Sequence, residues 1–273
     1  MRLRTIIGAL ALLLLVGGTP RLGAAQGPAV SAPNGKFEFD AGALTVPQSF
    51  VGRIAGALTL PLGDRFGIQA DLSAATAAGF SAGGALHLFT RDPQNYLVGG
   101  TFGFMRTPGA MILAAGPEAE LYLGHWTIEA WGGVAMARPT SGPDRVRPFG
   151  MVDFVVYPRD NLRLSAGLSL LDSFLAVHLG GEYQFEGSPF AVTGDARLGQ
   201  DGSLLATVGF KAYLGTDKSL LRRNREDDPW DRGNSLFTAL SGQTSDAATE
   251  LPPPLVCPPG TLESAGTCFP TGN

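Results

Sequence analysis

Side-chain alternation is the feature that constrains this chain most. From Lys36 to Gly215, apolar residues alternate with small or polar ones almost throughout, and clusters of Gly, Pro, Asp and Asn interrupt the pattern at intervals. In the segment 66–73, the even-numbered residues are apolar and the odd-numbered ones are small or polar. A helix would not keep two such sets on separate faces, because its side chains repeat every 3.6 residues. The pattern therefore predicts β-strands with one apolar face and one polar face.

The alternating segments predict twelve strands. Most are near ten residues long, which matches the 9 to 11 or so that a tilted strand needs to cross a bilayer, whereas strands of soluble domains cluster nearer 5 or 6. The sixth segment is interrupted by Gly116 and Pro117, and proline cannot donate a ladder hydrogen bond, so ten or fourteen strands are alternatives. The predicted strands are 36–46, 50–60, 66–76, 80–90, 96–107, 113–124, 127–137, 149–157, 162–172, 174–186, 190–200 and 204–215.

Compact turns follow every second strand and give a hairpin unit that repeats about every 30 residues. An even number of serial antiparallel strands places both termini on one side of the membrane, which is the periplasmic side in bacterial barrels. The longest connection on the opposite side is expected at Arg138 to Pro148. The compact turns are 63–65, 91–95, 124–126, 158–161 and 187–189.

The first 25 residues predict a cleaved secretory signal. Arg2 and Arg4 precede an apolar run from Ile6 to Val16, and small residues lead up to a cleavage point after Ala25. An N-terminal membrane anchor is the alternative, but eleven apolar residues fall short of the roughly 20 that a spanning helix needs. Cleavage removes three of the 20 basic residues and no acid, which leaves 17 against 24 and a formal charge of −7. This balance argues against nucleic acid as a partner.

A soluble β-sandwich is the main rival to a membrane barrel. The polar face of a sandwich looks into bulk water and carries many long charged side chains. Here the second face is mostly Gly, Ala, Ser and Thr, and only 16% of all residues are charged. We therefore predict an all-β fold: a transmembrane, antiparallel, up-and-down β-barrel over 36–215, after a lead-in at 26–35 and with outer-membrane lipid around it. Aromatic residues near strand ends predict two interfacial girdles, Phe66, Tyr96, Phe185 and Phe190 at one edge and Phe50, Phe80, Phe102 and Phe174 toward the other.

The segment 36–215 resembles the bacterial outer-membrane β-barrel superfamily. Its last strand carries Thr207, Gly209, Ala212 and Leu214 at the places of the signal read by the barrel-assembly machinery. The resemblance implies the bacterial outer membrane as the location and that machinery as a partner. Such signals usually end a protein, whereas this chain continues for 58 residues.

Residues on the polar face are the candidate site, because in a barrel of this size that face lines a narrow lumen. Two interpretations remain open: carboxylates and cations that pair across a closed lumen, or a small aqueous channel with an acidic bias. The predicted function is a narrow porin-like channel for small solutes; the alternative is a structural or adhesive envelope barrel with a closed lumen and a periplasmic docking tail. Glu38, Asp40, Arg53, His87 and His178 share this face, and the candidate lining residues are Asp71, Glu118, Glu120, Glu129, Asp153, Arg163, Glu182, Asp195, Arg197 and Lys211.

No enzyme, metal or cofactor is predicted. The chain has three histidines, and none lies in a recognisable catalytic motif. Metal-ligand spacings and phosphate-binding loops are also missing from the sequence.

The C-terminal 58 residues change in character. The segment 216–256 begins with a dense charge run, in which a short helix near Lys218 to Arg225 is conceivable, and continues as a Pro-, Ser- and Thr-rich periplasmic linker. A docking arm for a periplasmic or cell-wall partner and a disordered tail are equal alternatives. The small loop 257–273 holds both cysteines, and an oxidising periplasm predicts a disulfide between Cys257 and Cys268.

Overall fold

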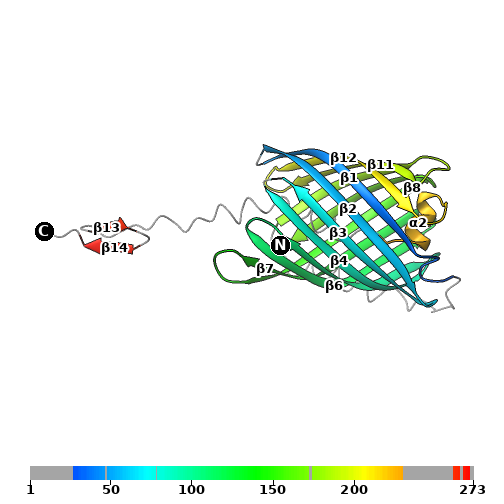
Figure 1. Ribbon diagram of the computed structural model, residues 1–273, viewed down its shortest axis with the longest axis horizontal. Coiled ribbons are helices and arrows are strands. Elements are labelled where there is room, and N and C mark those ends of the chain that lie inside the picture. The colour runs from blue at the N-terminus through cyan, green and yellow to red at the C-terminus, as the bar shows by residue number, and fades with distance from the viewer. Residues whose placement is uncertain are drawn as a thin grey trace, which may run out of the picture.

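Twelve antiparallel strands form a closed barrel (Figure 1). The computed structural model describes residues 27–46, 48–77, 79–171 and 174–229, together with the backbone of 261–264 and 267–270. Each strand pairs with the next along the chain, and β12 closes the barrel against β1. The strands are β1 (Asn34–Thr45), β2 (Gln48–Leu62), β3 (Phe66–Thr76), β4 (Phe80–Asp92), β5 (Tyr96–Arg106), β6 (Ala110–Leu123), β7 (Trp126–Pro139), β8 (Arg145–Arg159), β9 (Leu162–Leu171), β10 (Phe174–Gln184), β11 (Phe190–Gly199) and β12 (Leu204–Leu214).

The predicted number and order of the strands are confirmed, and the main difference lies between β7 and β8. The sequence predicted a loop from Arg138 to Pro148, but the connection covers only residues 140–144. Strands β7 and β8 extend into the expected loop and remain paired with each other there, as at Met136 with Val146. Only the backbone of Pro148 fails to donate, and its neighbours supply the ladder.

The Gly116–Pro117 interruption lies inside β6 and leaves the strand intact. On one side both residues pair with β5, but on the other side the register with β7 breaks between Ala115 and Glu118. The two strands approach closely at this point, since a Cβ on Gly116 would lie 1.9 Å from the carbonyl oxygen of Gly132. A glycine is therefore required where the proline disrupts the ladder.

The outer surface of the barrel is apolar. Large side chains such as Leu72, Phe80 and Val208 are 65%, 66% and 72% exposed. Among the described strand residues, exposed charged side chains occur only within three positions of a strand end: Arg106, Arg138, Arg145, Arg147 and Arg159. A wall that is apolar outside and polar inside is the pattern of a transmembrane barrel, and a water-soluble one would show the reverse.

The two ends of the barrel differ. At one end, here named the helix end, lie the short turns after β2, β4, β6, β8 and β10, together with the helix α2 (Leu220–Glu226). The connections of 140–144 and 200–203 lie at the opposite end, here named the loop end. Within the described part of the chain, no helix is long and apolar enough to cross a membrane.

Other predictions concern the chain termini. A small two-stranded antiparallel sheet, β13 (Thr261–Ser264) and β14 (Thr267–Pro270), lies near the C-terminus and pairs Glu263 with Cys268. The predicted signal peptide 1–25, most of the linker 216–256 and Cys257 lie outside the described residues. The disulfide and the domain boundaries therefore stay predictions.

Candidate functional site: the lumen of the barrel

All ten candidate lining residues lie on the inward face of the wall. Nine are buried and Asp195 is half-buried. Phe89 and Tyr157, which share the inward parity, are buried as well. Phe174, however, was expected in an outer girdle and instead faces inward, because the strand places Leu175 and Val177 on the lipid side. Eight of the ten candidate residues fall into three groups of contacts, and Glu120 and Asp195 lie outside these groups.

The first group surrounds His87. Its Nε2 lies 2.7 Å from Asp71 Oδ2, and its Nδ1 lies 3.1 Å from Glu118 Oε2. Gln69 extends the group, since its Nε2 donates to Asp71 Oδ1 at 2.7 Å. An imidazole with a carboxylate on each nitrogen satisfies both neighbours when both nitrogens carry hydrogen. The group therefore links β3, β4 and β6 across the inner wall.

The second group joins β7, β8, β9 and β10. Arg163 Nη2 donates to both carboxylate oxygens of Glu129, at 3.1 and 3.0 Å. His178 Nε2 contacts Asp153 Oδ1, and Arg197 of β11 donates to Ser169 Oγ at 2.9 Å. A hydrogen bond between a guanidinium and a carboxylate is charge-assisted and is among the stronger polar contacts in proteins.

The third group closes the barrel seam between β1 and β12. Arg53 Nε donates to Asp40 Oδ2 at 2.8 Å, and Lys211 Nζ lies 2.7 Å from Glu182 Oε2 and 3.6 Å from Glu38 Oε2. Glu38 also accepts a hydrogen bond from Thr193 and lies 3.5 Å from Arg53. Glu120, the last candidate, accepts a hydrogen bond from Tyr122 at 3.0 Å.

A small cavity remains between the second and third groups. It measures about 50 Å³, and its lining includes Glu38, Arg53, His178, Glu182 and Asp195. One water molecule needs roughly 10 to 15 Å³ on this measure, so the cavity holds only a few. His178 Nδ1 is buried without a hydrogen-bond partner in the described structure, which such a water would supply.

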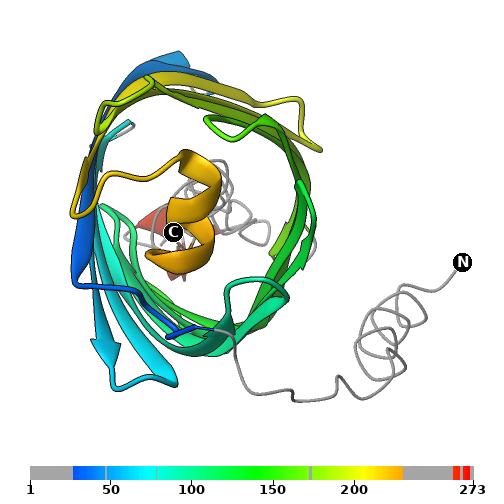
Figure 2. The ribbon, with the colours of Figure 1, turned by 90° about the vertical axis from the view of Figure 1, so that its right-hand side faces the viewer.

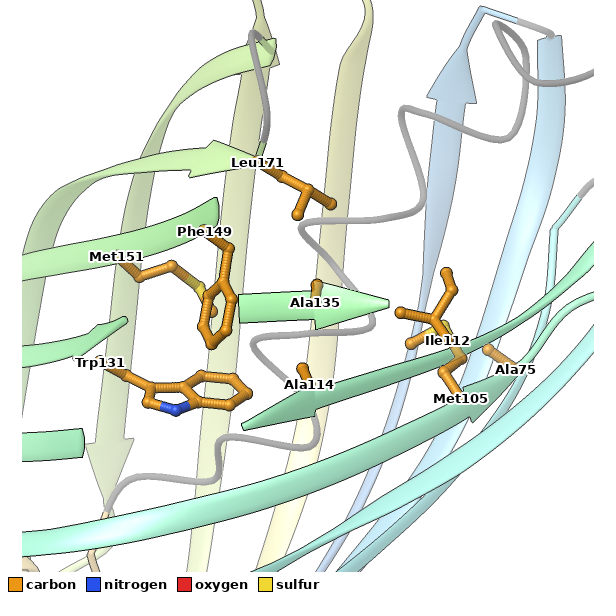
Figure 3. Packing of buried hydrophobic residues seen from close by; sticks show 9 residues of the cluster. All are labelled: Ala75, Met105, Ile112, Ala114, Trp131, Ala135, Phe149, Met151 and Leu171. Atoms are coloured by element: carbon orange, nitrogen blue, oxygen red, sulfur yellow. The ribbon is translucent and has the colours of Figure 1, made fainter. Parts of the chain in front are cut away.

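Apolar side chains line the lumen toward the loop end (Figure 3). Trp131 and Phe149 pack edge to face with their ring centres 4.7 Å apart, while Met105 and Ile112 sit opposite each other on β5 and β6. We name this set the apolar belt: Ala75, Met105, Ile112, Ala114, Trp131, Ala135, Phe149, Met151 and Leu171, with Leu44, Val51 and Leu205 forming a second patch.

The helix α2 lies inside the mouth of the barrel at the helix end (Figure 2). Leu220 is fully buried in an apolar cluster with Val155, Tyr157, Ala191 and Tyr213, all inward residues of the wall. The start of the helix is held by the turn between β8 and β9: Leu221 N donates to the carbonyl of Asp160 at 2.9 Å, and Leu220 N to Asn161 Oδ1 at 3.2 Å.

Polar contacts hold the rest of the mouth. Asn224 Nδ2 donates to the Tyr157 hydroxyl at 2.9 Å, and Arg225 Nη2 donates to the carbonyl of Trp126 at 2.9 Å. After the helix, Asp228 lies 2.8 Å from Lys36 Nζ. The sequence allowed a short helix here; its place inside the mouth comes from the structure alone.

Residues 27–33 complete the closure of the helix end. Val30 is buried against Phe89, Leu97 and Tyr122. The backbone N of Ser31 donates to the carbonyl of Glu226 at 2.9 Å, which ties this segment to α2.

Glu226 is a titratable group of the mouth outside the strands. Burial raises its pKa, but hydrogen bonds from Arg222 and Lys218 outweigh burial and hold the pKa below the ordinary value of 4.5. The Arg222 contact is an i, i+4 pair with Nε 2.8 Å from Oε1.

Several inward-facing residues were not among the lumen-lining residues predicted from the sequence. Arg91 was assigned to a turn but is buried in β4 with its guanidinium over the Phe89 ring, 5.0 Å from the ring centre. Trp131 lies two positions after Glu129 on β7 and therefore shares its face. A large aromatic residue on the polar face could have indicated from the sequence that part of the lumen is apolar. The sequence held no comparable signal for α2, because its docking depends on the shape of the mouth.

Hydroxyl, imidazole and carboxylate groups do meet at His87, with Thr101 Oγ1 3.1 Å from Nδ1. Glu118 shares that nitrogen, however, and all three partners are buried, so no substrate reaches the hydroxyl in this arrangement. Among the described residues, no group of three or more His, Cys, Asp or Glu side chains is placed to hold a metal ion.

Comparison with known proteins gives structural neighbours only. No protein-family model and no curated protein sequence matches the chain. Among solved structures, the KdgM porin is 6% identical with a TM-score of 0.48, over 65% of this chain and 98% of that one. An outer membrane channel from Pseudomonas putida F1 is 10% identical with a TM-score of 0.49, over 70% and 98%. A porin of Rhodopseudomonas blastica is 11% identical with a TM-score of 0.30, over 67% and 99%.

The structure of the barrel wall shows that the protein spans a membrane. Twelve strands close without a free edge, the outer face is apolar, and the charged side chains lie inside. Only closed barrels and helices can satisfy every backbone hydrogen bond within a bilayer. The chain is therefore a transmembrane β-barrel.

Proposed function

We propose that the protein is a porin-like barrel that is closed in the state described here and conducts small cations or neutral solutes when α2 leaves the mouth. The observation that carries the proposal is the helix itself, which fills one mouth of a lumen lined with ionisable groups. A lumen that served only as a structural core would gain more from apolar packing than from buried ion pairs.

Charge in the lumen supports a preference for cations. Acids outnumber Lys and Arg on the inward face of the described strands, nine to six, and two histidines lie on the same face. The acids are Glu38, Asp40, Asp71, Glu118, Glu120, Glu129, Asp153, Glu182 and Asp195; the cations are Lys36, Arg53, Arg91, Arg163, Arg197 and Lys211, and the histidines are His87 and His178. Rings of carboxylates favour cations in a pore.

The contacts that hold α2 in the mouth also support the proposal that the helix can leave and open the pore. Leu220 is the one helical side chain that is fully buried in the apolar cluster of the wall, with Leu221 packed against it. The other anchors are hydrogen bonds, an ion pair, and the guanidinium groups of Arg223 and Arg225 over wall tyrosine rings. Each such hydrogen bond contributes about 1 kcal/mol net, so the helix can leave without unfolding the wall.

Planar-bilayer recording of the whole chain tests the proposal. We expect a low open probability in the unmodified protein and frequent discrete steps in Leu220→Asp, because a buried carboxylate expels the helix from its apolar cluster. The matched control is Thr216→Asp, which adds the same acid at an exposed position just before the helix and should stay closed. Silence of Leu220→Asp over a wide voltage range would overturn the proposal in favour of a structural barrel with a closed lumen.

Selectivity is the second readout. Replacing Asp71, Glu129 and Asp153 with Asn in the Leu220→Asp background should shift the reversal potential toward anions, since His87, Arg163 and His178 then each lose a carboxylate partner. An unchanged reversal potential would mean that these carboxylates do not line the conduction path.

A further inference from the structure

We propose that residues 230–256 run through the lumen along the apolar belt and present the cysteine segment 257–273 at the loop end, on the opposite side of the membrane from α2. The inference goes beyond the proposed function and adds an occupant for the lumen; because this segment follows α2 directly, it would have to leave the pore with the helix for the channel to conduct. It rests on where the described chain ends, on the chemistry of the belt and on the length of the segment.

The described chain ends inside the barrel. Asp227, Asp228 and Pro229 are buried. Asp227 contacts Ser31 and Lys218 at the rim, whereas Asp228 contacts Lys36 on the inner wall. The carbonyl of Pro229 accepts hydrogen bonds from Lys36 Nζ at 3.0 Å and Gln69 Nε2 at 3.5 Å. Gln69 is the fourth residue of β3 and itself bonds to Asp71. The chain therefore points from the rim toward the charged middle of the lumen.

The apolar belt is a surface that needs a cover. Its large side chains point into the lumen, where water would meet them if nothing lay on them, at a cost proportional to the apolar area. Trp131 is 2% exposed, and its indole Nε1 has no hydrogen-bond partner in the described structure. A buried indole N–H normally finds an acceptor, and the backbone carbonyls of a passing segment would supply one.

The segment fits this path in length and composition. Its 27 residues extend to about 90 Å, whereas the hydrocarbon core is about 30 Å thick. It holds only four charged residues, Ser, Thr, Gly and Ala predominate in its middle, and Leu236, Phe237 and Leu240 offer apolar contacts for the belt.

Labelling on whole cells tests the side on which the cysteine segment lies. In Cys257→Ser, Cys268 is the only cysteine, and a membrane-impermeant maleimide reports whether it is reachable from outside. Two controls in a cysteine-free background mark the two ends of the barrel. Ser141→Cys places a thiol at an exposed loop-end position, and Asp64→Cys places one in an exposed helix-end turn. We expect Cys268 to react on intact cells together with Ser141→Cys. Reaction only after permeabilisation, together with Asp64→Cys, would overturn the proposal, as would no reaction while both controls react.

Disulfide trapping tests the path along the belt. In a background without Cys257 and Cys268, Ala135→Cys in the belt is paired in turn with cysteine at Leu236, Phe237 or Leu240. We expect at least one pair to cross-link under mild oxidation, and the outward-facing Ala166→Cys on β9 to give none. If none of the three pairs forms, the segment does not lie on the belt. Both readouts are independent of conductance, so this proposal and the proposed function fail separately.

Discussion

The two halves of the lumen are stabilised by different chemistry. Toward the helix end and the middle, charged groups pair across neighbouring strands, as Arg163 does with Glu129. Toward the loop end, apolar side chains such as Trp131 and Phe149 pack against one another. Both sets face the same interior, and both hold neighbouring strands together.

The difference lies in how each half responds to a missing partner. A buried ion pair that loses one member leaves an uncompensated charge, which costs several kcal/mol. An apolar contact that loses a side chain leaves a space, which costs less when neighbours or a covering segment can move in. The charged half therefore specifies one arrangement of the wall, whereas the apolar half tolerates an occupant.

The largest loss of stability on mutation is expected in the charged half of the lumen. Arg163→Met should lower the free energy of unfolding by about 4 kcal/mol, because Glu129 stays buried in the wall without its cationic partner. The measurement is the urea dependence of unfolding, followed by the loss of the compact form on unheated gels. The double variant with Glu129→Met should recover most of the loss; if it is as unstable as the single variant, the pair does not stabilise the wall through its charges.

The wall was predictable from the sequence, and the closure of its mouth was not. Alternation set the strand positions, so that the predicted 66–76 coincides with β3. The same parity placed Glu129 and Arg163 inward, but their pairing depends on the stagger of β7 to β9, which turns alone do not fix. The docking of Leu220 depends on contacts between residues some 60 positions apart, and no local pattern records them.

In the apolar half, Phe149→Ala should lower the free energy of unfolding by about 3 kcal/mol, since it removes the ring that packs on Trp131. The matched control is Phe154→Ala on the same strand, whose 55% exposed ring faces lipid and should cost less than half as much. Equal losses in the two variants would show that the inward and outward faces of β8 are packed equally tightly. The claim that the apolar belt is packed more tightly than the lipid-facing surface would then be wrong.

A smaller effect is expected where the helix meets the wall. Asn224→Ala removes the hydrogen bond to Tyr157 and should weaken docking of α2 by about 1 kcal/mol. Hydrogen exchange of the α2 amides should then be about fivefold faster, with the strand amides unchanged. Asn95→Ala, which removes a side-chain bond to Asp92 in a turn at the same end, serves as the control and should leave α2 protected.

The smallest effect is a pH dependence confined to the mouth. Because hydrogen bonds from Arg222 and Lys218 outweigh burial and lower the pKa of Glu226, the docked helix holds this carboxylate ionised more firmly than the free helix does. The resulting stabilisation is fully present above the ordinary pKa of 4.5 and is lost as the pH falls through the lowered value. Protection factors of the α2 amides, corrected for intrinsic exchange, should therefore fall between about pH 5 and pH 3, while those of β9 stay constant. In Glu226→Gln the acid step should vanish, with protection already reduced at neutral pH; a step that persists in this variant would show that Glu226 is not its source.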